Sequence, residues 1–267
     1  MNIRVDGHQA RKRFGQNFLA DTSVVARIVE SIQPHRHDTL LEIGPGLGAL
    51  THALLERVEY LTAIELDRDL AARLRTETRI QNRLTLIEAN ALHVDYQNLA
   101  PGTKWRIVGN LPYNISTPLL FVLLNHAADI QDMYFMLQKE VVERMTATPG
   151  SKTYGRLSIM VQYRCQVDAL FDVPPESFLP PPKVMSAVVR LQPRPWSLRC
   201  DNDDILDRLV ARLFNQRRKT LRTILRGTMT DEHWQQLDID PSARPETLPI
   251  DSLILLSNHL ALRNVMP

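Results

Sequence analysis

The chain has 267 residues, of which 44% are hydrophobic and 23% charged, and its formal net charge is only +2. This length allows one α/β domain of ordinary size and a small additional domain. Two cysteines, Cys165 and Cys200, exclude a dense disulfide framework and lack the spacing of a zinc site. No secretory segment and no long apolar run is evident, so we expect a soluble cytoplasmic protein.

The chain begins with a basic arm, expected over residues 1–20. Arg11, Lys12 and Arg13 stand together in this arm. Neighbouring cations attract phosphate groups, so the arm is a candidate contact for a nucleic acid.

The first strand is predicted at residues 39–43, which form a short apolar run. Gly44, Gly46 and Gly48 follow at alternate positions, and glycine lets the backbone turn sharply and approach a ligand closely. Residues 47–57 then have helical spacing of their leucines. A strand, a glycine turn and a helix form the first crossover of a doubly wound sheet.

The ligand expected at this turn is a nucleoside that carries a positive charge. The turn reads G-x-G-x-G rather than the G-x-G-x-x-G of dinucleotide-binding proteins. Glu42, just before it, suits the sulfonium of adenosylmethionine better than a pyrophosphate. The next strand, residues 60–65, ends in Glu65, whose carboxylate can accept two hydrogen bonds from a ribose diol. A structural turn without a ligand is the alternative.

A further strand, residues 105–109, leads into the tetrapeptide Asn110-Leu111-Pro112-Tyr113. Asn110 therefore lies at the carboxyl end of a strand, where open α/β sheets bind ligands. Its amide oxygen and a backbone carbonyl near Leu111 can each accept a hydrogen from an adenine amine and so direct the nitrogen lone pair at a methyl carbon. Pro112 stiffens this backbone, and Tyr113 can stack on the base.

Positioning is the main catalytic device of such a site, because the amine needs no general base before the transfer. Together with the glycine turn, the tetrapeptide indicates a methyltransferase that acts on the amino group of a base. A turn that merely ends a strand is the alternative interpretation of these four residues.

Seven strands and a helical C-terminal region are expected. The strands are predicted at residues 39–43, 60–65, 84–88, 105–109, 132–138, 166–173 and 184–191. Pro193 and Pro195 indicate a linker, after which the pattern is helical. The expected domains are therefore an arm over residues 1–20, a sheet domain over 21–192 and a helical domain over 198–267.

In the helical region we expect Asp231 to cap a helix over residues 232–237, and residues 253–262 to form an apolar final helix. The segment from Arg208 to Thr230 contains no acidic residue. The candidates for phosphate binding in it are Arg217, Arg218, Lys219, Arg222 and Arg226. Three of these arginines recur every four residues, which predicts one basic helical face. An ordinary solvated face is the alternative.

The chain resembles the bacterial small-subunit (16S) ribosomal RNA adenine N6,N6-dimethyltransferases, the KsgA/RsmA family, over nearly its full length. The motifs that carry the resemblance lie at residues 11–19, 42–51, 63–67, 110–116, 136–141, 154–158, 178–184 and 214–220. The resemblance implies a Rossmann-like class I methyltransferase domain, with a mostly parallel seven-stranded sheet, and a small all-helical C-terminal domain.

The resemblance also implies the reaction. S-adenosyl-L-methionine is the expected methyl donor, and the acceptors are two adjacent adenosines in the 3′-terminal hairpin loop of small-subunit rRNA. Each adenosine is methylated twice at N6, within a pre-30S particle, with a role in small-subunit biogenesis. We expect a monomer that needs no metal and no membrane.

Site residues carry over from the resemblance by position. Those expected to bind the cofactor are Gln16, Asn17, Leu19, Glu42, Gly44, Gly46, Glu65, Asn90, Ala91 and Asn110. The expected catalytic residues are Asn110, Leu111, Pro112, Tyr113 and Phe178. Phe178 resembles the aromatic residue that closes over the target base opposite Tyr113. Where the family usually has Asp beside the adenine amine of the cofactor, this chain has Asn90, which can accept a hydrogen bond but carries no charge.

Two other functions remain open. A large-subunit rRNA adenine methyltransferase of the antibiotic-resistance type shares the catalytic tetrapeptide. A mainly non-catalytic ribosome assembly factor would bind the particle without modifying it. The motifs at residues 180–183 and 214–219 favour the small-subunit enzyme.

Overall fold

The computed structural model describes residues 4–5, 8–9, 16–99 and 102–263. The chain forms two compact units. The first contains residues 1–142 and 166–193, and the second contains residues 143–165 and 194–267. The first unit ends close to the expected linker. Residues 143–165, which we expected in the sheet domain, belong to the second unit instead.

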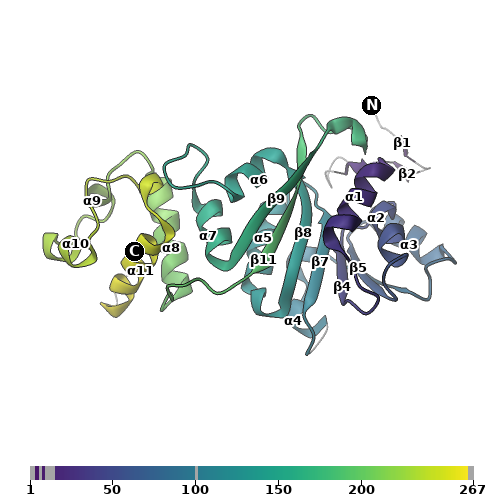
Figure 1. Cartoon of the computed structure of the whole chain (residues 1–267), viewed down its shortest axis with the longest axis horizontal. Helices are drawn as coiled ribbons and strands as arrows, with labels where there is room; N and C mark the ends of the chain where they lie inside the picture. The colour runs from purple at the N-terminus through teal and green to yellow at the C-terminus, as the bar shows by residue number, and fades with distance from the viewer. Residues whose placement is uncertain (1–3, 6–7, 10–15, 100–101, 264–267) are drawn as a thin grey trace. The chain divides into compact units, whose positions relative to one another are not determined.

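Strands and helices alternate from β3 to β8 in the first unit, and the second unit contains helices α7 to α11 (Figure 1). The strands are β1 (Arg4–Val5), β2 (His8–Gln9), β3 (Phe18–Leu19), β4 (Leu40–Ile43), β5 (Leu61–Glu65), β6 (Leu84–Glu88), β7 (Trp105–Asn110), β8 (Ile130–Gln138), β9 (Cys165–Val173), β10 (Phe178–Leu179) and β11 (Ser186–Pro193). The helices are α1 (Thr22–Ile32), α2 (Ala49–Leu55), α3 (Arg68–Thr76), α4 (Tyr96–Leu99), α5 (Ser116–Asn125), α6 (Lys139–Met145), α7 (Arg156–Arg164), α8 (Asp203–Asn215), α9 (Leu221–Ile224), α10 (Asp231–Leu237) and α11 (Ile250–Leu262).

Seven strands form one sheet in the order β6-β5-β4-β7-β8-β11-β9. The neighbours from β6 to β8 are parallel, and β11 is antiparallel to β8. The predicted seven-stranded, mostly parallel sheet is therefore confirmed, and each predicted strand agrees with the structure within two residues at either end. The chain winds outward in opposite directions from β4 and β7, and the carboxyl ends of such a pair frame the ligand crevice of doubly wound folds.

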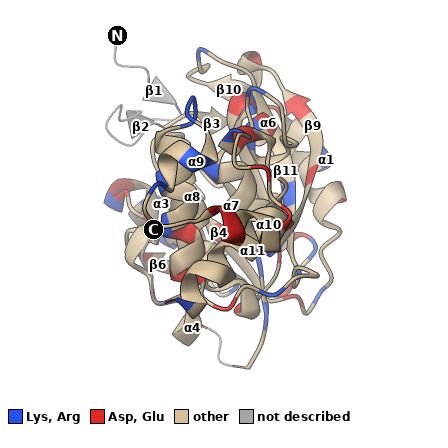
Figure 2. Cartoon of the chain, turned by 90° about the vertical axis from the view of Figure 1, so that its left-hand side faces the viewer, with Lys and Arg blue, Asp and Glu red and all other residues tan. Residues whose placement is uncertain are grey.

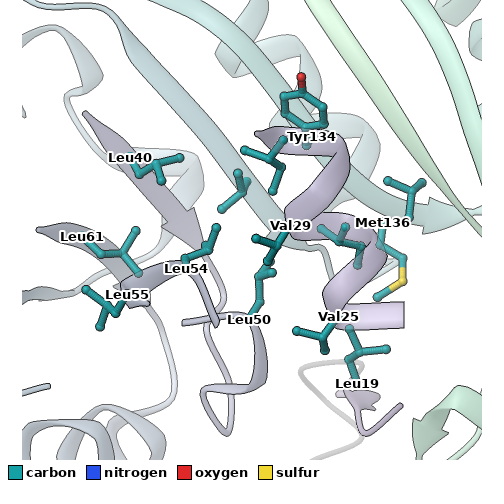
Figure 3. Packing of buried hydrophobic residues seen from close by; sticks show 14 of the residues in the cluster. Leu19, Val25, Val29, Leu40, Leu50, Leu54, Leu55, Leu61, Tyr134 and Met136 are labelled. Carbon is teal, nitrogen blue, oxygen red and sulfur yellow. The ribbon is translucent and has the colours of Figure 1, made fainter. Parts of the chain in front are cut away.

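The central strands form because their residues are apolar on both faces, as is typical of strands covered by helices on both sides. All four residues of β4 are buried. Val25 and Val29 of α1 and Leu50 and Leu54 of α2 belong to one cluster with the sheet (Figure 3). Burying each such side chain fully stabilises the fold by about 1.5–3 kcal/mol.

Contacts at both ends of β7 fix the position of its last residue, Asn110. Gly109 lies so near β4 that a Cβ there would be 2.5 Å from the carbonyl oxygen of Ile43. At the other end of the strand, the buried Arg106 guanidinium donates to Asp132 of β8 at 2.9 Å and to Asp38 at 2.7 Å. Asn110 is thereby held beside the glycine turn that follows β4.

The basic segment of the second unit differs from the sequence prediction. Helix α8 ends at Asn215, and α9 is only four residues long. A turn closed by the Lys219 N–H and the Gln216 carbonyl separates them, and Gly227, at φ +80°, follows α9. The predicted single helical face is therefore wrong, because Arg218 precedes α9 and Arg226 follows it.

The predicted cap of α10 is also displaced by one residue. Thr230 is the N-cap, and Asp231 is the first residue of the helix. The His233 ring nitrogen Nδ1 accepts the Thr230 N–H at 3.0 Å, so a side chain inside the helix satisfies the capping backbone. The final helix is confirmed but begins at Ile250. Within the described part of the chain, the helices all fall short of the length and apolar character that crossing a membrane requires.

Candidate active site

One pocket of the first unit lies at the carboxyl ends of β4, β5, β7 and β8. Its lining includes every residue predicted to bind the cofactor: Gln16, Asn17, Leu19, Glu42, Gly44, Gly46, Glu65, Asn90, Ala91 and Asn110. It also includes Leu111, Pro112 and Tyr113. The structure thus brings together motifs that lie far apart in the sequence, and their roles remain predictions.

The glycine turn forms one wall of the pocket. Gly44 and Gly46 have φ values of +71° and +60°, which residues with a side chain rarely adopt. A Cβ on Gly46 would also lie 3.1 Å from the ring of Phe18, which lines the same pocket. Glycine here is therefore required by the backbone and by the close approach of the N-terminal segment.

Two carboxyl groups lie in this wall and are almost fully buried. Glu42 accepts the Thr51 hydroxyl at 2.7 Å, and Glu65 accepts the backbone N–H groups of Gly46 at 3.1 Å and of Asp67 at 2.8 Å. Burial raises the pKa of Glu42 to about 7, and the neighbouring Glu65 carboxylate adds to the rise. Burial also raises the pKa of Glu65, which the two N–H donors partly offset. Such a wall favours a cation or a hydrogen-bond donor as its ligand.

Asp67 is outside the pocket lining, but it contacts Gln16, which belongs to that lining. It is buried and accepts the Gln16 side-chain amide at 3.0 Å. It also caps α3, through the Asp69 N–H. Asp67 therefore joins the segment before β3 to the loop after β5. Asp67 belongs to the family motif at residues 63–67, but no separate role was predicted for it.

A hydrogen bond to Asn17 fixes the orientation of the Asn110 side-chain amide. Its Nδ2 group donates to the Asn17 backbone carbonyl at 2.9 Å. A carbonyl oxygen only accepts, so the amide must turn its amino side toward Asn17. Its oxygen, Oδ1, is then the atom left to accept a hydrogen from a ligand in the pocket.

Tyr113 is held by a residue of β11, the strand beside β8 in the sheet. Its hydroxyl lies 2.7 Å from the hydroxyl of Ser186, a fully buried residue at the start of β11. Burial raises the pKa of Tyr113, so the phenol stays neutral at physiological pH. Ser186 is 73 residues away in sequence, and nothing in its local sequence marked it as part of the site.

Phe178 pairs in the β3–β10 ladder with Leu19, which lines the pocket, but its own side chain is buried. Its side chain is 1% exposed and packs in the same hydrophobic cluster as Leu19 and Val25. It is absent from the pocket lining among the described residues. The predicted clamp of Phe178 and Tyr113 on a base therefore stays a prediction.

Asn90 caps a short 3₁₀ turn at the edge of the pocket. Its Oδ1 accepts the Leu92 N–H at 3.0 Å. The oxygen keeps a second lone pair, whereas the remaining polar atom, Nδ2, is a donor. An aspartate would offer an acceptor at both atoms, so the exchange changes the hydrogen-bonding character of this edge.

The candidate RNA contacts fall into three groups. Arg11, Lys12 and Arg13 lie outside the described residues. Arg217 donates to the carbonyls of Ser151 and Lys152, and Arg222 forms an ion pair with Asp231 at 2.5 Å. The remaining cations, Arg218, Lys219 and Arg226, are exposed, and no partner for them occurs among the described residues. Figure 2 shows basic residues at α9, in the middle of this segment.

No group of three or more His, Cys, Asp or Glu side chains in the described ranges is arranged to hold a metal ion. The pocket instead combines backbone amides, two buried carboxyl groups, one anchored amide and one anchored phenol. That arrangement can hold a cationic nucleoside and orient an amine beside it.

Comparison with protein families matches residues 7–262 to the model described as ribosomal RNA adenine dimethylase. The chain is 52% identical to ribosomal RNA small subunit methyltransferase A of Acinetobacter baylyi, over 97% of this chain and 96% of that protein. It is 53% identical to the protein of the same name from Bordetella petrii, over 97% and 98% of the two chains.

The fold is similar to two solved structures along nearly the whole chain. A dimethyladenosine transferase from Plasmodium falciparum matches with a TM-score of 0.79 and 26% identity, over 93% of this chain and 98% of that one. The 23S rRNA methyltransferase ErmE matches with a TM-score of 0.71 and 25% identity, over 92% and 100%.

Proposed function

The chain belongs to the ribosomal RNA adenine dimethylase family, and from that premise we propose that it methylates adenosines of small-subunit rRNA with S-adenosyl-L-methionine as donor. The proposed acceptors are the N6 amines of two adjacent adenosines in the 3′-terminal hairpin loop of 16S rRNA. Each receives two methyl groups, within a pre-30S particle in the cytoplasm, and the enzyme acts as a monomer. The names of relatives at 52% and 53% identity support the small subunit as substrate.

The pocket fits S-adenosylmethionine by the chemistry of its donors and acceptors. Glu42 and Glu65 place two carboxyl groups in a buried wall, and a cationic ligand favours their ionised form. Each Glu65 oxygen accepts one backbone N–H and keeps a lone pair for a ribose hydroxyl. Asn90 keeps one lone pair for the adenine amine. When bound, the cofactor would supply an electrophilic methyl group on its sulfonium and, as the S–CH3 bond breaks, would leave as the neutral thioether S-adenosylhomocysteine.

The chain's own residues then position the acceptor. Asn110 Oδ1 accepts one hydrogen of the target amine, and a backbone carbonyl near Leu111 accepts the other. The nitrogen lone pair, otherwise delocalised into the ring, is thereby directed toward the methyl group. Tyr113 supports one face of the base. The proton becomes acidic only as the new C–N bond forms and is then released to water. The adenosine has to leave its stack to reach the pocket.

The observation that carries this proposal is the 2.9 Å hydrogen bond from Asn110 Nδ2 to the Asn17 carbonyl. It leaves Oδ1 as the free acceptor and fixes its direction before any substrate arrives. A preoriented acceptor at the reaction centre contributes more than one that must be ordered during the reaction.

Primer extension on small-subunit rRNA tests the function. Purified small subunits lacking the modification are incubated with donor and enzyme, and the expected result is a stop at two adjacent adenosines of the 3′-terminal hairpin. Asn110→Ala should abolish the stop. Asn82→Ala, at an exposed asparagine just before β6, should preserve it. A stop on bare large-subunit rRNA alone would indicate an activity like that named for ErmE, and binding without any stop would indicate an assembly factor.

A further inference from the structure

We propose that residues 179–185, which join β10 to β11, form a docking edge for the RNA nucleotides that flank the target adenosine. This edge, called the proline edge below, contains three consecutive prolines and one lysine. The inference rests on the proposed function and adds a substrate contact to the same site.

The proline edge gathers exposed apolar side chains. Leu179, Val184 and Met185 are 45%, 44% and 38% exposed. The other exposed large hydrophobic side chains of the described chain are Tyr60, Leu66, Leu255 and Leu262. Three of the seven therefore fall within seven consecutive residues, whereas the other four form two pairs, Tyr60 with Leu66 and Leu255 with Leu262. Single exposed apolar side chains need no explanation, but a cluster marks an interaction surface.

Both ends of the proline edge are attached to the pocket. Leu179 pairs with Phe18 in the β3–β10 ladder, and Phe18 lines the pocket. At the other end, Ser186 is bonded to Tyr113, which also lines it. The edge therefore begins and ends beside residues that contact the pocket lining, and a nucleotide next to a bound adenosine would meet it.

The backbone of the proline edge is held in place before any ligand binds. The rings of Pro180, Pro181 and Pro182 each fix φ. The Met185 carbonyl accepts the Lys139 N–H at 2.9 Å. A surface with so little backbone freedom loses little entropy when it binds a partner.

The charge of the edge selects a nucleic acid. The sequence contains no acidic residue from Ser177 to Cys200. Lys183 is exposed and has no partner among the described residues, whereas the nearby Lys139 is already paired with Asp172 at 2.6 Å. One free cation beside apolar side chains suits a nucleotide, whose base packs on apolar surface and whose phosphate meets the lysine.

Two variants test the edge separately from the chemistry. Val184→Ser combined with Met185→Ser removes the apolar surface, and Lys183→Gln removes the charge. The matched controls are Tyr60→Ser and Lys104→Gln, two exposed residues just before β5 and β7, at the opposite end of these strands from the pocket. The probes are a synthetic RNA of the 3′-terminal hairpin and purified small subunits.

For both probes, the double variant should raise the apparent KM on the order of tenfold. Lys183→Gln should reduce the slope of log affinity against log salt by about 0.7. Calorimetry should give wild-type affinity for S-adenosylmethionine in both variants, and the controls should match the wild type throughout.

The proposal is overturned if the edge variants bind both RNAs as the wild type does. It is also overturned if the control variants lose as much RNA affinity as the edge variants do. It is equally overturned if only binding to the subunit weakens while binding to the synthetic hairpin stays unchanged, because the occupant would then be a protein. A wild-type enzyme that methylates neither probe would refute the proposed function instead.

Discussion

The active-site pocket of the first unit and the basic segment at residues 217–226 of the second unit use polar side chains in opposite ways. In the pocket, Asn110 is held by a carbonyl 93 residues away and Tyr113 by a hydroxyl 73 residues away. In the basic segment, Arg218 and Arg226 are exposed and have no partner in the described part of the chain. Orienting one amine requires fixed atoms, whereas attracting phosphates requires only charge.

The largest effect on activity should come from replacing Asn110, whose Oδ1 atom is the fixed acceptor of the pocket. Asn110→Ala removes the acceptor, and single-turnover methyl transfer should fall on the order of 100-fold or more. Asn110→Asp separates position from chemistry, because it keeps acceptor oxygens but has no donor for the Asn17 carbonyl. We expect Asn110→Asp to be nearly as inactive as Asn110→Ala. An Asp variant within a few-fold of the wild type would show that the anchor to Asn17 is dispensable.

The buried carboxyl group of Glu42 gives a second strong effect, this time on stability. The group should ionise near pH 4.5 in the unfolded chain and near pH 7 in the folded one. The folded state then holds its proton over a pH range in which the unfolded state has lost it. The wild-type free energy of unfolding therefore falls as the pH rises from 4.5 through 7.

Glu42→Gln removes this titration and keeps an acceptor for Thr51. At pH 8, without cofactor, the variant should be more stable than the wild type by on the order of 3 kcal/mol, and the difference should vanish near pH 4. Urea unfolding at several pH values measures it, with Glu30→Gln on an exposed position of α1 as control. A difference that does not change with pH would contradict the raised pKa.

The sequence predicted most of the fold because local patterns dictate it. Apolar runs marked the seven strands, and the glycine turn and the tetrapeptide had to meet because parallel strands end at one edge of the sheet. Phe178 shows the limit, since nothing local distinguishes an aromatic residue in the core from one at a pocket. Two hydrogen bonds of the site could not be predicted either, because they depend on tertiary packing: those from Asn110 to Asn17 and between Tyr113 and Ser186.

The basic segment was mispredicted for a different reason. A spacing of four residues indicates one face only if the helix is continuous. Here α8 ends at Asn215, before the first of the three arginines, and a turn follows at residues 216–219. The charge itself was predicted correctly, because the absence of acids is a property of the sequence. Asp231, the ion-pair partner of Arg222, lies just beyond that acid-free segment, so this pairing was not predicted.

A smaller effect is expected at Glu65. Glu65→Ala removes the proposed partner of the ribose and should weaken cofactor binding by about 1.5–3 kcal/mol. Glu65→Gln should not restore it, because its amino side would face one of the N–H donors of Gly46 and Asp67. Titration calorimetry with S-adenosylmethionine measures both. Wild-type affinity in the alanine variant would remove Glu65 from the site.

The smallest effect should come from the basic segment, and it should appear as a change in salt dependence. Each phosphate contact adds about 0.7 to the slope of log affinity against log salt for single-stranded RNA. Arg218→Ala combined with Arg226→Ala should therefore lower the slope for subunit binding by roughly 1.4. Cofactor affinity and the identity of the methylated adenosines should not change, because phosphate contacts carry no sequence information.

Arg222→Ala is the internal control for this last prediction, because Asp231 already pairs with that guanidinium. Its effect on the slope should be less than half that of the double variant. Arg217→Ala is unsuitable for the same purpose, since the bonds of Arg217 to the Ser151 and Lys152 carbonyls couple it to the fold of the second unit.

If the double variant and the wild type have identical slopes, the segment is an ordinary solvated surface. The phosphate contacts would then have to come from Arg11, Lys12 and Arg13, which the same titration on a triple alanine variant would reveal.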